Sequence, residues 1–193
     1  MGNLNDFDFK KDKVAPKDYT ELDKWITLKA KNLQEEVIKD YENFEIHLAF
    51  QKVLNFCTNE LGGFYLDIIK DRLYTSKKEG AARRSAQSSM YQVYSSLLTL
   101  ISPILSFTAE EAYLEKNGEG SSIFLSSWFD GWEEFDQKIE DDLWEQLVSL
   151  KNNVNKEIEE KRNLGKLGSS LEATVSLKSV SYTHLTLPTI YSV

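Results

Sequence analysis

The side chains best suited to chemistry in this sequence are cations gathered around one short polar stretch. Between Asp67 and Arg84 there are six basic residues and three acidic ones, with the aromatic Tyr74 among them. Aromatic rings and guanidinium planes stack on the unpaired bases of RNA loops, and cations bind the phosphates. The stretch is therefore a candidate RNA-binding surface. The alternative stays open that the arginines, Arg72 above all, pair with carboxylates or only add surface charge.

Groups that could catalyse a reaction or hold a metal ion are scarce. The sequence has two histidines, His47 and His184, and one cysteine, Cys57, without the spacing of metal ligands. The adjacent acidic residues of the later part of the chain are typical of a solvated helix face, not of carboxyls held in a pocket. No Gly-rich phosphate loop is present. We therefore expect neither catalysis nor a bound cofactor in this chain.

Two apolar-periodic segments flank the basic stretch and must position it. In the second segment, apolar residues recur at intervals of three and four from Ala86 to Ile104, which is typical of one face of a helix. The first segment, from Leu61 to Leu73, has the same spacing more roughly. If the two helices pack antiparallel, the cations between them converge at one end of a bundle.

Polar residues mark where other helices begin. Thr20 followed by Asp23 predicts an N-cap, and apolar residues recur at helical spacing after it. Asn43 is the expected N-cap of a second helix. Thr108 with Glu111 has the spacing of a capping box, which predicts that a short helix begins at Thr108.

Glycine and proline interrupt these patterns. The adjacent Gly62 and Gly63 each cost roughly 1 kcal/mol relative to alanine in a helix, so we expect a kink or a brief break there. Pro103 lacks an amide hydrogen and should bend or stop the long helix. Trp128 and Trp132 are expected to lie back across the bundle.

The C-terminal part changes character twice. Apolar spacing predicts a helix over residues 139–162, and alternation of apolar and polar residues over 171–178 predicts a strand. Residues 179–193 do not continue this pattern, and we interpret them as a non-native tail.

Composition bounds the class of protein. The chain has 193 residues, of which 41% are hydrophobic and 28% charged, as in globular domains. Its single cysteine excludes an internal disulfide and suits a reducing cytosol, and no apolar run is long enough to cross a membrane. The net charge is −8, and most of it lies on the segment from Asp130 to Arg162, which has eleven acidic and five basic residues. This acidity leaves open a second hypothesis, a helical protein-interaction module without RNA binding.

Three motifs occur in order: FYLDIIKDRLYT from Phe64, RRSAQ from Arg83 and LISPILSFTAEEAY from Leu100. Together they resemble the anticodon-binding helical region of isoleucyl-tRNA synthetase, a class I aminoacyl-tRNA synthetase. The similarity covers roughly the first 178 residues. The equivalent domains of the valine and leucine enzymes are alternatives, although KDRLY and RRSAQ favour isoleucine.

The resemblance implies a mainly α fold, an antiparallel helical bundle with the beginning of a small α/β segment at its C-terminal end. Residues 1–19 would then form an irregular segment leading out of the catalytic part, residues 20–117 the bundle, and residues 118–178 a packing loop, an acidic helix and the first strand of a junction domain. The residues implied to bind tRNA are Lys70, Arg72, Tyr74, Lys77, Lys78, Arg83, Arg84 and Gln87.

The resemblance also implies what lies outside this chain. The ATP-handling HIGH and KMSKS motifs of the family are absent here, so the chain is expected to be an inactive fragment that lacks the catalytic domain. The whole enzyme would be a cytoplasmic monomer, without membrane contact, that uses ATP and Mg²⁺ to join isoleucine to its tRNA. The implied partners of this chain are isoleucine tRNA and the catalytic domain of the same enzyme.

Overall fold

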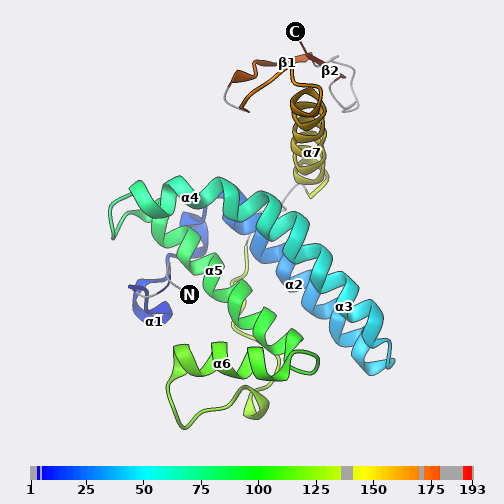
Figure 1. The fold of residues 1–193 in the computed structure, drawn as a ribbon. Helices are drawn as coiled ribbons and strands as arrows, with labels where there is room; N and C mark the ends of the chain where they lie inside the picture. Colours follow the sequence, from blue (N-terminus) through cyan, green and yellow to red (C-terminus); the bar gives the residue numbers. More distant parts are fainter. Residues whose placement is uncertain (1–3, 5, 136–140, 170–171, 179–188, 193) are drawn as a thin grey trace. The chain divides into compact units, whose positions relative to one another are not determined.

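A computed structural model describes residues 4, 6–135, 141–169, 172–178 and 189–192. The expected mainly α fold is confirmed (Figure 1). The chain divides into two compact units, Met1–Ile139 and Glu140–Val193, and each is described by itself.

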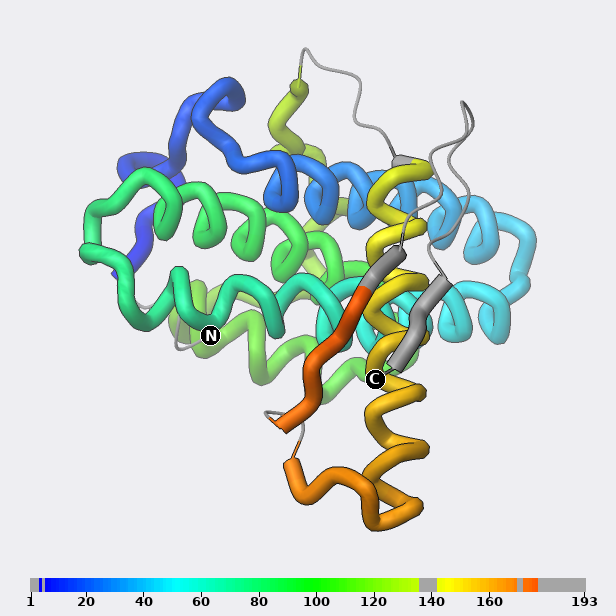
Figure 2. The backbone as a smooth tube through the Cα atoms, turned by 90° about the horizontal axis from the view of Figure 1, so that it is seen from above, coloured from blue at the N-terminus to red at the C-terminus, as the bar shows by residue number. Residues whose placement is uncertain are grey.

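The first unit is a bundle of helices. Its longer helices are α2 (Glu21–Glu42), α3 (Ile46–Asn55), α4 (Leu66–Thr75), α5 (Ala81–Ile101) and α6 (Ser106–Asn117). The shorter elements are α1 (Phe9–Asp12), the 3-10 turns η2 (Pro16–Asp18) and η4 (Ile123–Leu125), and a π-helix, η3 (Phe56–Tyr65), which joins α3 to α4. Helices α2 and α3 form an antiparallel pair, and α5 packs along α2 (Figures 1 and 2).

The ends of two helices agree with the sequence. Helix α2 begins after Thr20, whose hydroxyl accepts a hydrogen bond from the amide of Asp23, so the predicted N-cap is confirmed. Helix α5 ends at Ile101, two residues before Pro103, as expected for a residue that cannot donate a backbone hydrogen bond.

Two predicted helix starts are wrong. Asn43 is the C-cap of α2, and α3 begins three residues later because Phe44 takes a φ of 60° and extends the turn. Thr108 lies inside the first turn of α6, which begins at Ser106. The amide of Ala109 already bonds the carbonyl of Leu105, at 2.9 Å, so the helical hydrogen bonds start before the expected capping box.

The glycine pair does not break the helix as expected. The chain continues through it as the π-helix η3, in which the backbone turns more widely than in an α-helix. A Cβ on Gly62 would lie 2.8 Å from the carbonyl oxygen of Cys57, and one on Gly63 would lie 2.7 Å from that of Thr58. The glycines therefore permit a close approach of carbonyls five residues earlier.

Apolar side chains fill the centre of the bundle. Val37, Ala49, Val53 and Leu100 form one buried cluster between α2, α3 and α5. Trp128 stacks on Tyr41 with ring centroids 6.0 Å apart, and the amide of Gln34 donates to the carbonyl of Phe129 at 2.7 Å. The expectation that this segment lies back across the bundle is confirmed.

One buried carboxylate, that of Asp23, connects four elements. Asp23 is fully buried, and its oxygens accept hydrogen bonds from the guanidinium of Arg72 at 2.8 and 3.2 Å and from the hydroxyl of Tyr65 at 2.8 Å. Ser85 donates to the same carboxylate. Burial and the adjacent carboxylate raise the pKa of Tyr65 well above its usual value, so this phenol stays a donor. The carboxylate of α2 thus accepts hydrogen bonds from α4, α5 and the π-helix.

The second unit contains α7 (Asp141–Asn163), β1 (Val175–Lys178) and β2 (Thr189–Ser192). The strands pair antiparallel, with Val175 opposite Ser192 and Lys178 opposite Thr189. The predicted helix and strand are confirmed in type; the strand begins at Val175, and residues 139–140 of the predicted helix lie outside the described part. Strand β2 belongs to the stretch interpreted as a non-native tail. Residues 179–188 of that stretch lie outside the described part, and its origin stays a prediction.

Replacing Gly63 by alanine tests the π-helix. In an exposed α-helix this change stabilises by roughly 1 kcal/mol. Here we expect a loss of about 1–3 kcal/mol in the free energy of unfolding, because the new methyl group overlaps the carbonyl of Thr58. Urea unfolding measures it, with the exposed Asn59→Ala as control, expected within about 0.5 kcal/mol of wild type. A stabilised Gly63→Ala would contradict the π-helix.

Replacing Asp23 by asparagine tests the buried carboxylate. We expect the free energy of unfolding to fall by about 3–5 kcal/mol, because a largely buried guanidinium loses its counter-charge. The matched control is Asp67→Asn, which removes the exposed partner of Lys70 and should cost under about 1 kcal/mol. Equal losses in the two variants would show that Asp23 does not hold the elements together.

Candidate nucleic-acid interface

The predicted RNA-binding residues lie at one end of the bundle. They belong to α4, to the connection formed by residues 76–80, and to the first two turns of α5. The opposite end of the bundle is the turn between α2 and α3 at residues 43–45 (Figures 1 and 2). The antiparallel packing therefore brings the predicted residues to a common end, as the sequence indicated.

Four of the eight residues face solvent. Tyr74 is 73% exposed, so its ring is accessible to a ligand. Lys77 and Lys78 are exposed, and neither forms an ion pair within the described part of the chain. Lys70 is exposed and forms a 2.8 Å ion pair with Asp67, one turn earlier on α4. A phosphate can reach these ammonium groups without displacing any buried group.

Arg72 instead points into the bundle. Its guanidinium forms the ion pair with Asp23 and also donates to the hydroxyl of Thr20 at 3.1 Å. The sequence left open that Arg72 pairs with Asp71, Glu79 or a neighbouring helix, and the partner is Asp23 of helix α2, 49 positions away. Helices α2 and α4 both pack on α5, and this long-range packing brings the two groups together.

Arg83, Arg84 and Gln87 are covered by the segment that precedes the bundle, residues 6–19, here called the leading segment. The carboxylate of Asp6 lies 3.0 Å from Arg83 and accepts a hydrogen bond from Gln87 at 2.9 Å. The backbone carbonyl of Asp6 accepts a hydrogen bond from Arg84 at 3.0 Å. Burial acts to raise the pKa of Asp6, but the bond from Gln87 and the charge of Arg83 lower it below its usual 3.8.

The eight residues predicted to bind tRNA therefore fall into two groups, one accessible to a ligand and one bonded within the chain. The two lysines of the connection, Lys70 and Tyr74 are open to a ligand, whereas three arginines and a glutamine bond groups of the chain itself. Contact between RNA and Arg72, Arg83, Arg84 or Gln87 stays a prediction. Such contact would require these side chains to give up carboxylate or carbonyl partners.

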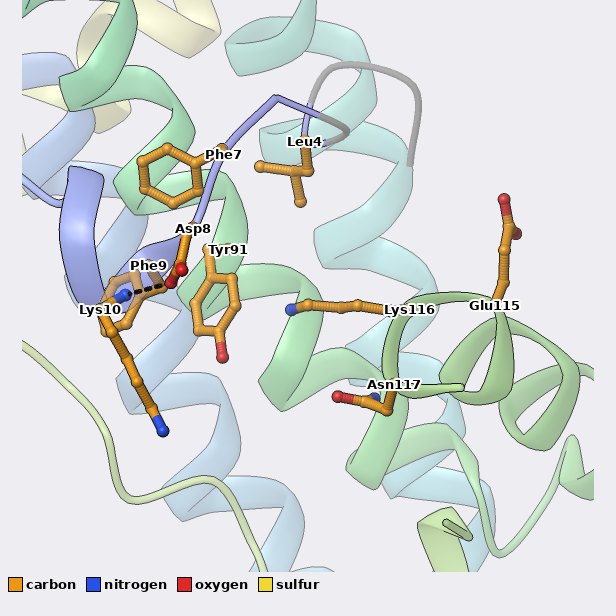
Figure 3. A pocket seen from close by; sticks show the side chains of 9 residues that line it. All are labelled: Leu4, Phe7, Asp8, Phe9, Lys10, Tyr91, Glu115, Lys116 and Asn117. Carbon is orange, nitrogen blue, oxygen red and sulfur yellow. Dashed lines mark hydrogen bonds between the residues drawn. The ribbon is translucent and has the colours of Figure 1, made fainter. Parts of the chain in front are cut away.

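A pocket of about 580 Å³ lies beside the leading segment, and the sequence analysis did not identify it (Figure 3). Lys116, at the end of α6, places its Nζ 3.4 Å from the ring centroid of Tyr91, and Phe9 stacks on that ring at 4.2 Å. Burial lowers the pKa of Lys116 to about 8. The pocket also has the acidic Asp8 and Glu115 in its lining, so its charge does not select one ligand.

The described residues were also compared with the requirements of a metal site and of a membrane-spanning helix. No three His, Cys, Asp or Glu side chains among them are grouped so that they could hold a metal ion. None of the described helices has the length and apolar character needed to span a membrane.

The chain is similar to known proteins along most of its length. Residues 23–177 match the family model described as the anticodon-binding domain of tRNA ligase. The isoleucine–tRNA ligases of Shewanella baltica (strain OS155) and Shewanella oneidensis are 45% and 44% identical to it over 180 residues. That of Idiomarina loihiensis is 43% identical.

In each case the match covers 92% of this chain and 19% of the relative, so the chain spans about a fifth of the length of these ligases. A family match over most of the chain, together with identity above 40%, agrees with the helical bundle and with the three motifs. The chain belongs to the anticodon-binding domain family of tRNA ligases.

Proposed function

We propose that this chain binds the anticodon stem-loop of isoleucine tRNA as part of a longer isoleucine–tRNA ligase. The family match and the names of the relatives support this proposal. The observation that carries it is the exposed combination of Tyr74, Lys77 and Lys78 at one end of the bundle. The ring can stack on an unpaired base while the ammonium groups bind the flanking phosphates.

The contribution of this chain to the reaction would be positional. A ligase of this family joins isoleucine to its tRNA with ATP and Mg²⁺ at a catalytic domain outside this chain. Holding the anticodon stem-loop fixes where the acceptor end reaches that domain, and a displacement of about 1 Å can lower a rate on the order of a hundredfold. The proposal includes a monomeric enzyme in the cytoplasm, which the single cysteine suits.

The second hypothesis, an acidic interaction module without RNA binding, rests on the net charge of −8. A charge total does not exclude RNA, because binding depends on where the cations lie. Here Lys77 and Lys78 are exposed on the connection between α4 and α5. These exposed cations, together with the match to the anticodon-binding domain family, favour the RNA-binding proposal.

Removing both lysines of the connection tests the phosphate contacts. For Lys77→Ala/Lys78→Ala we expect roughly tenfold weaker binding of a synthetic isoleucine anticodon stem-loop, because two counter-charges are lost. The slope of log affinity against log salt should decrease by about 1.4. Filter-binding titrations across salt measure both quantities. The control is Lys39→Ala, an exposed lysine near the opposite end of the bundle; equal effects of the two changes would remove the connection from the interface.

Replacing Tyr74 by leucine tests base stacking separately from charge. We expect a loss of about 1–3 kcal/mol in binding free energy, with the salt slope unchanged, because a stacked ring is removed and no cation is. The phenylalanine variant should retain wild-type affinity, since it keeps the ring. Fluorescence anisotropy with the same stem-loop measures these affinities, and a Leu variant that binds like wild type would exclude stacking on Tyr74.

A further inference from the structure

The leading segment is bound to α5 through several different interactions. Its polar contacts centre on Asp6, which meets Arg83, Arg84 and Gln87 within 3.0 Å. A further acid of the segment, Asp12, lies 3.6 Å from Arg84. These bonds use both the side chain and the backbone of Asp6, so they fix the direction of the chain at that residue.

Aromatic rings extend this contact. Phe9 stacks on Tyr91 of α5 with ring planes only 8° from parallel, and Phe7 packs against both rings at 6.4 Å (Figure 3). The guanidinium of Arg84 lies 5.6 Å from the ring centroid of Phe7. These same rings line the pocket beside Lys116. Polar and apolar contacts together hold the segment over two turns of α5.

Further along, backbone amides of the segment and of Thr20, which follows it, donate hydrogen bonds to serines of α5. The amide of Val14 donates to Ser88 at 3.3 Å, and the amide of Thr20 donates to Ser85 at 3.0 Å. Ser85 in turn donates to the carboxylate of Asp23. Hydrogen bonds at Asp6, Val14 and Thr20 therefore hold the leading segment and the start of α2 against α5.

The arginines involved have little capacity left for RNA. The side chains of Arg83 and Arg84 are only 19% and 11% exposed. At Arg83, an RNA phosphate would compete with the Asp6 carboxylate, which already accepts hydrogen bonds from Arg83 and Gln87. Such multi-point bonding of a planar guanidinium is the use for which arginine is better suited than lysine.

We propose that Asp6, Arg83, Arg84 and Gln87 form an anchor that sets the direction in which the chain joins the rest of the ligase, and that these arginines act as positioning residues rather than as RNA contacts. This inference rests on the proposed function. If the anticodon end and the catalytic domain must keep a fixed separation, the joint between them has to be rigid. The anchor supplies that rigidity at the bundle side of the joint.

Limited trypsin digestion of this chain tests the anchor. Lys10, Lys11 and Lys13 follow Asp6 and are cut when the segment opens. We expect Asp6→Asn to raise their rate of cleavage about tenfold or more, because charge-assisted bonds are lost. The matched control, Asp18→Asn, removes an exposed carboxylate of the same segment and should leave the rate unchanged.

A second variant, Arg83→Gln, tests whether the two residues act together. The double variant should be cut no faster than the more sensitive single variant, because both changes break one contact. Circular dichroism identifies any variant whose bundle is unfolded. An unchanged cleavage rate in Asp6→Asn, with the bundle intact, overturns the anchor.

Binding of the anticodon stem-loop separates the anchor from RNA contact. We expect Asp6→Asn and Arg83→Gln to bind the stem-loop like wild type, and saturating stem-loop to leave cleavage of the segment unchanged. Faster cleavage on adding RNA, or weaker binding by Arg83→Gln, would show that the arginines contact RNA. If wild type does not bind the stem-loop, the proposed function fails, while the cleavage rates still decide whether the anchor exists.

The positioning role is tested in the whole ligase that carries this sequence. We expect Asp6→Asn to lower kcat for aminoacylation about tenfold while the KM for tRNA stays unchanged, because binding is intact and the acceptor end is misplaced. An unchanged kcat would show that the anchor only fixes the segment locally. A raised KM with unchanged kcat would instead return these residues to the RNA interface.

Discussion

The buried ion pair between Asp23 and Arg72 is the interaction on which the arrangement of the bundle depends. A carboxylate removed from water is tolerated only when its oxygens are bonded, and here donors come from α4, α5 and the π-helix. Because these elements are far apart in the sequence, the pair specifies one packing of the helices. The connection between α4 and α5 is held where the lysines and Tyr74 face outward.

Cations at this end of the bundle are divided between two roles. The arginines bond carboxylates and carbonyls of the chain, which suits a planar group with several donors. The lysines of the connection stay hydrated, which suits a flexible point charge that meets phosphate. The net charge of −8 is compatible with RNA binding because this small surface is locally basic.

Helical spacing of apolar residues was enough to predict the long helices, and Thr20 and Pro103 correctly marked two of their ends. The π-helix was not predicted, because adjacent glycines indicate a break in a helix unless it is known that carbonyls five residues earlier approach them closely. A partner of Arg72 on a neighbouring helix was left open, but Asp23 could not be named as that partner, nor Asp6 as the partner of Arg83, because they lie 49 and 77 residues away. Local sequence can place a cation at one end of a bundle, but the direction of its side chain depends on distant carboxylates.

The most direct test of this account is a hydrogen–deuterium exchange map of the chain with and without a synthetic isoleucine anticodon stem-loop. Amides of residues 74–78 should exchange more slowly when RNA is bound, and those of residues 6–14 should exchange as before. Faster exchange over residues 6–14, together with protection of Arg83 to Gln87, would contradict the account. It would show that RNA takes the arginines from Asp6.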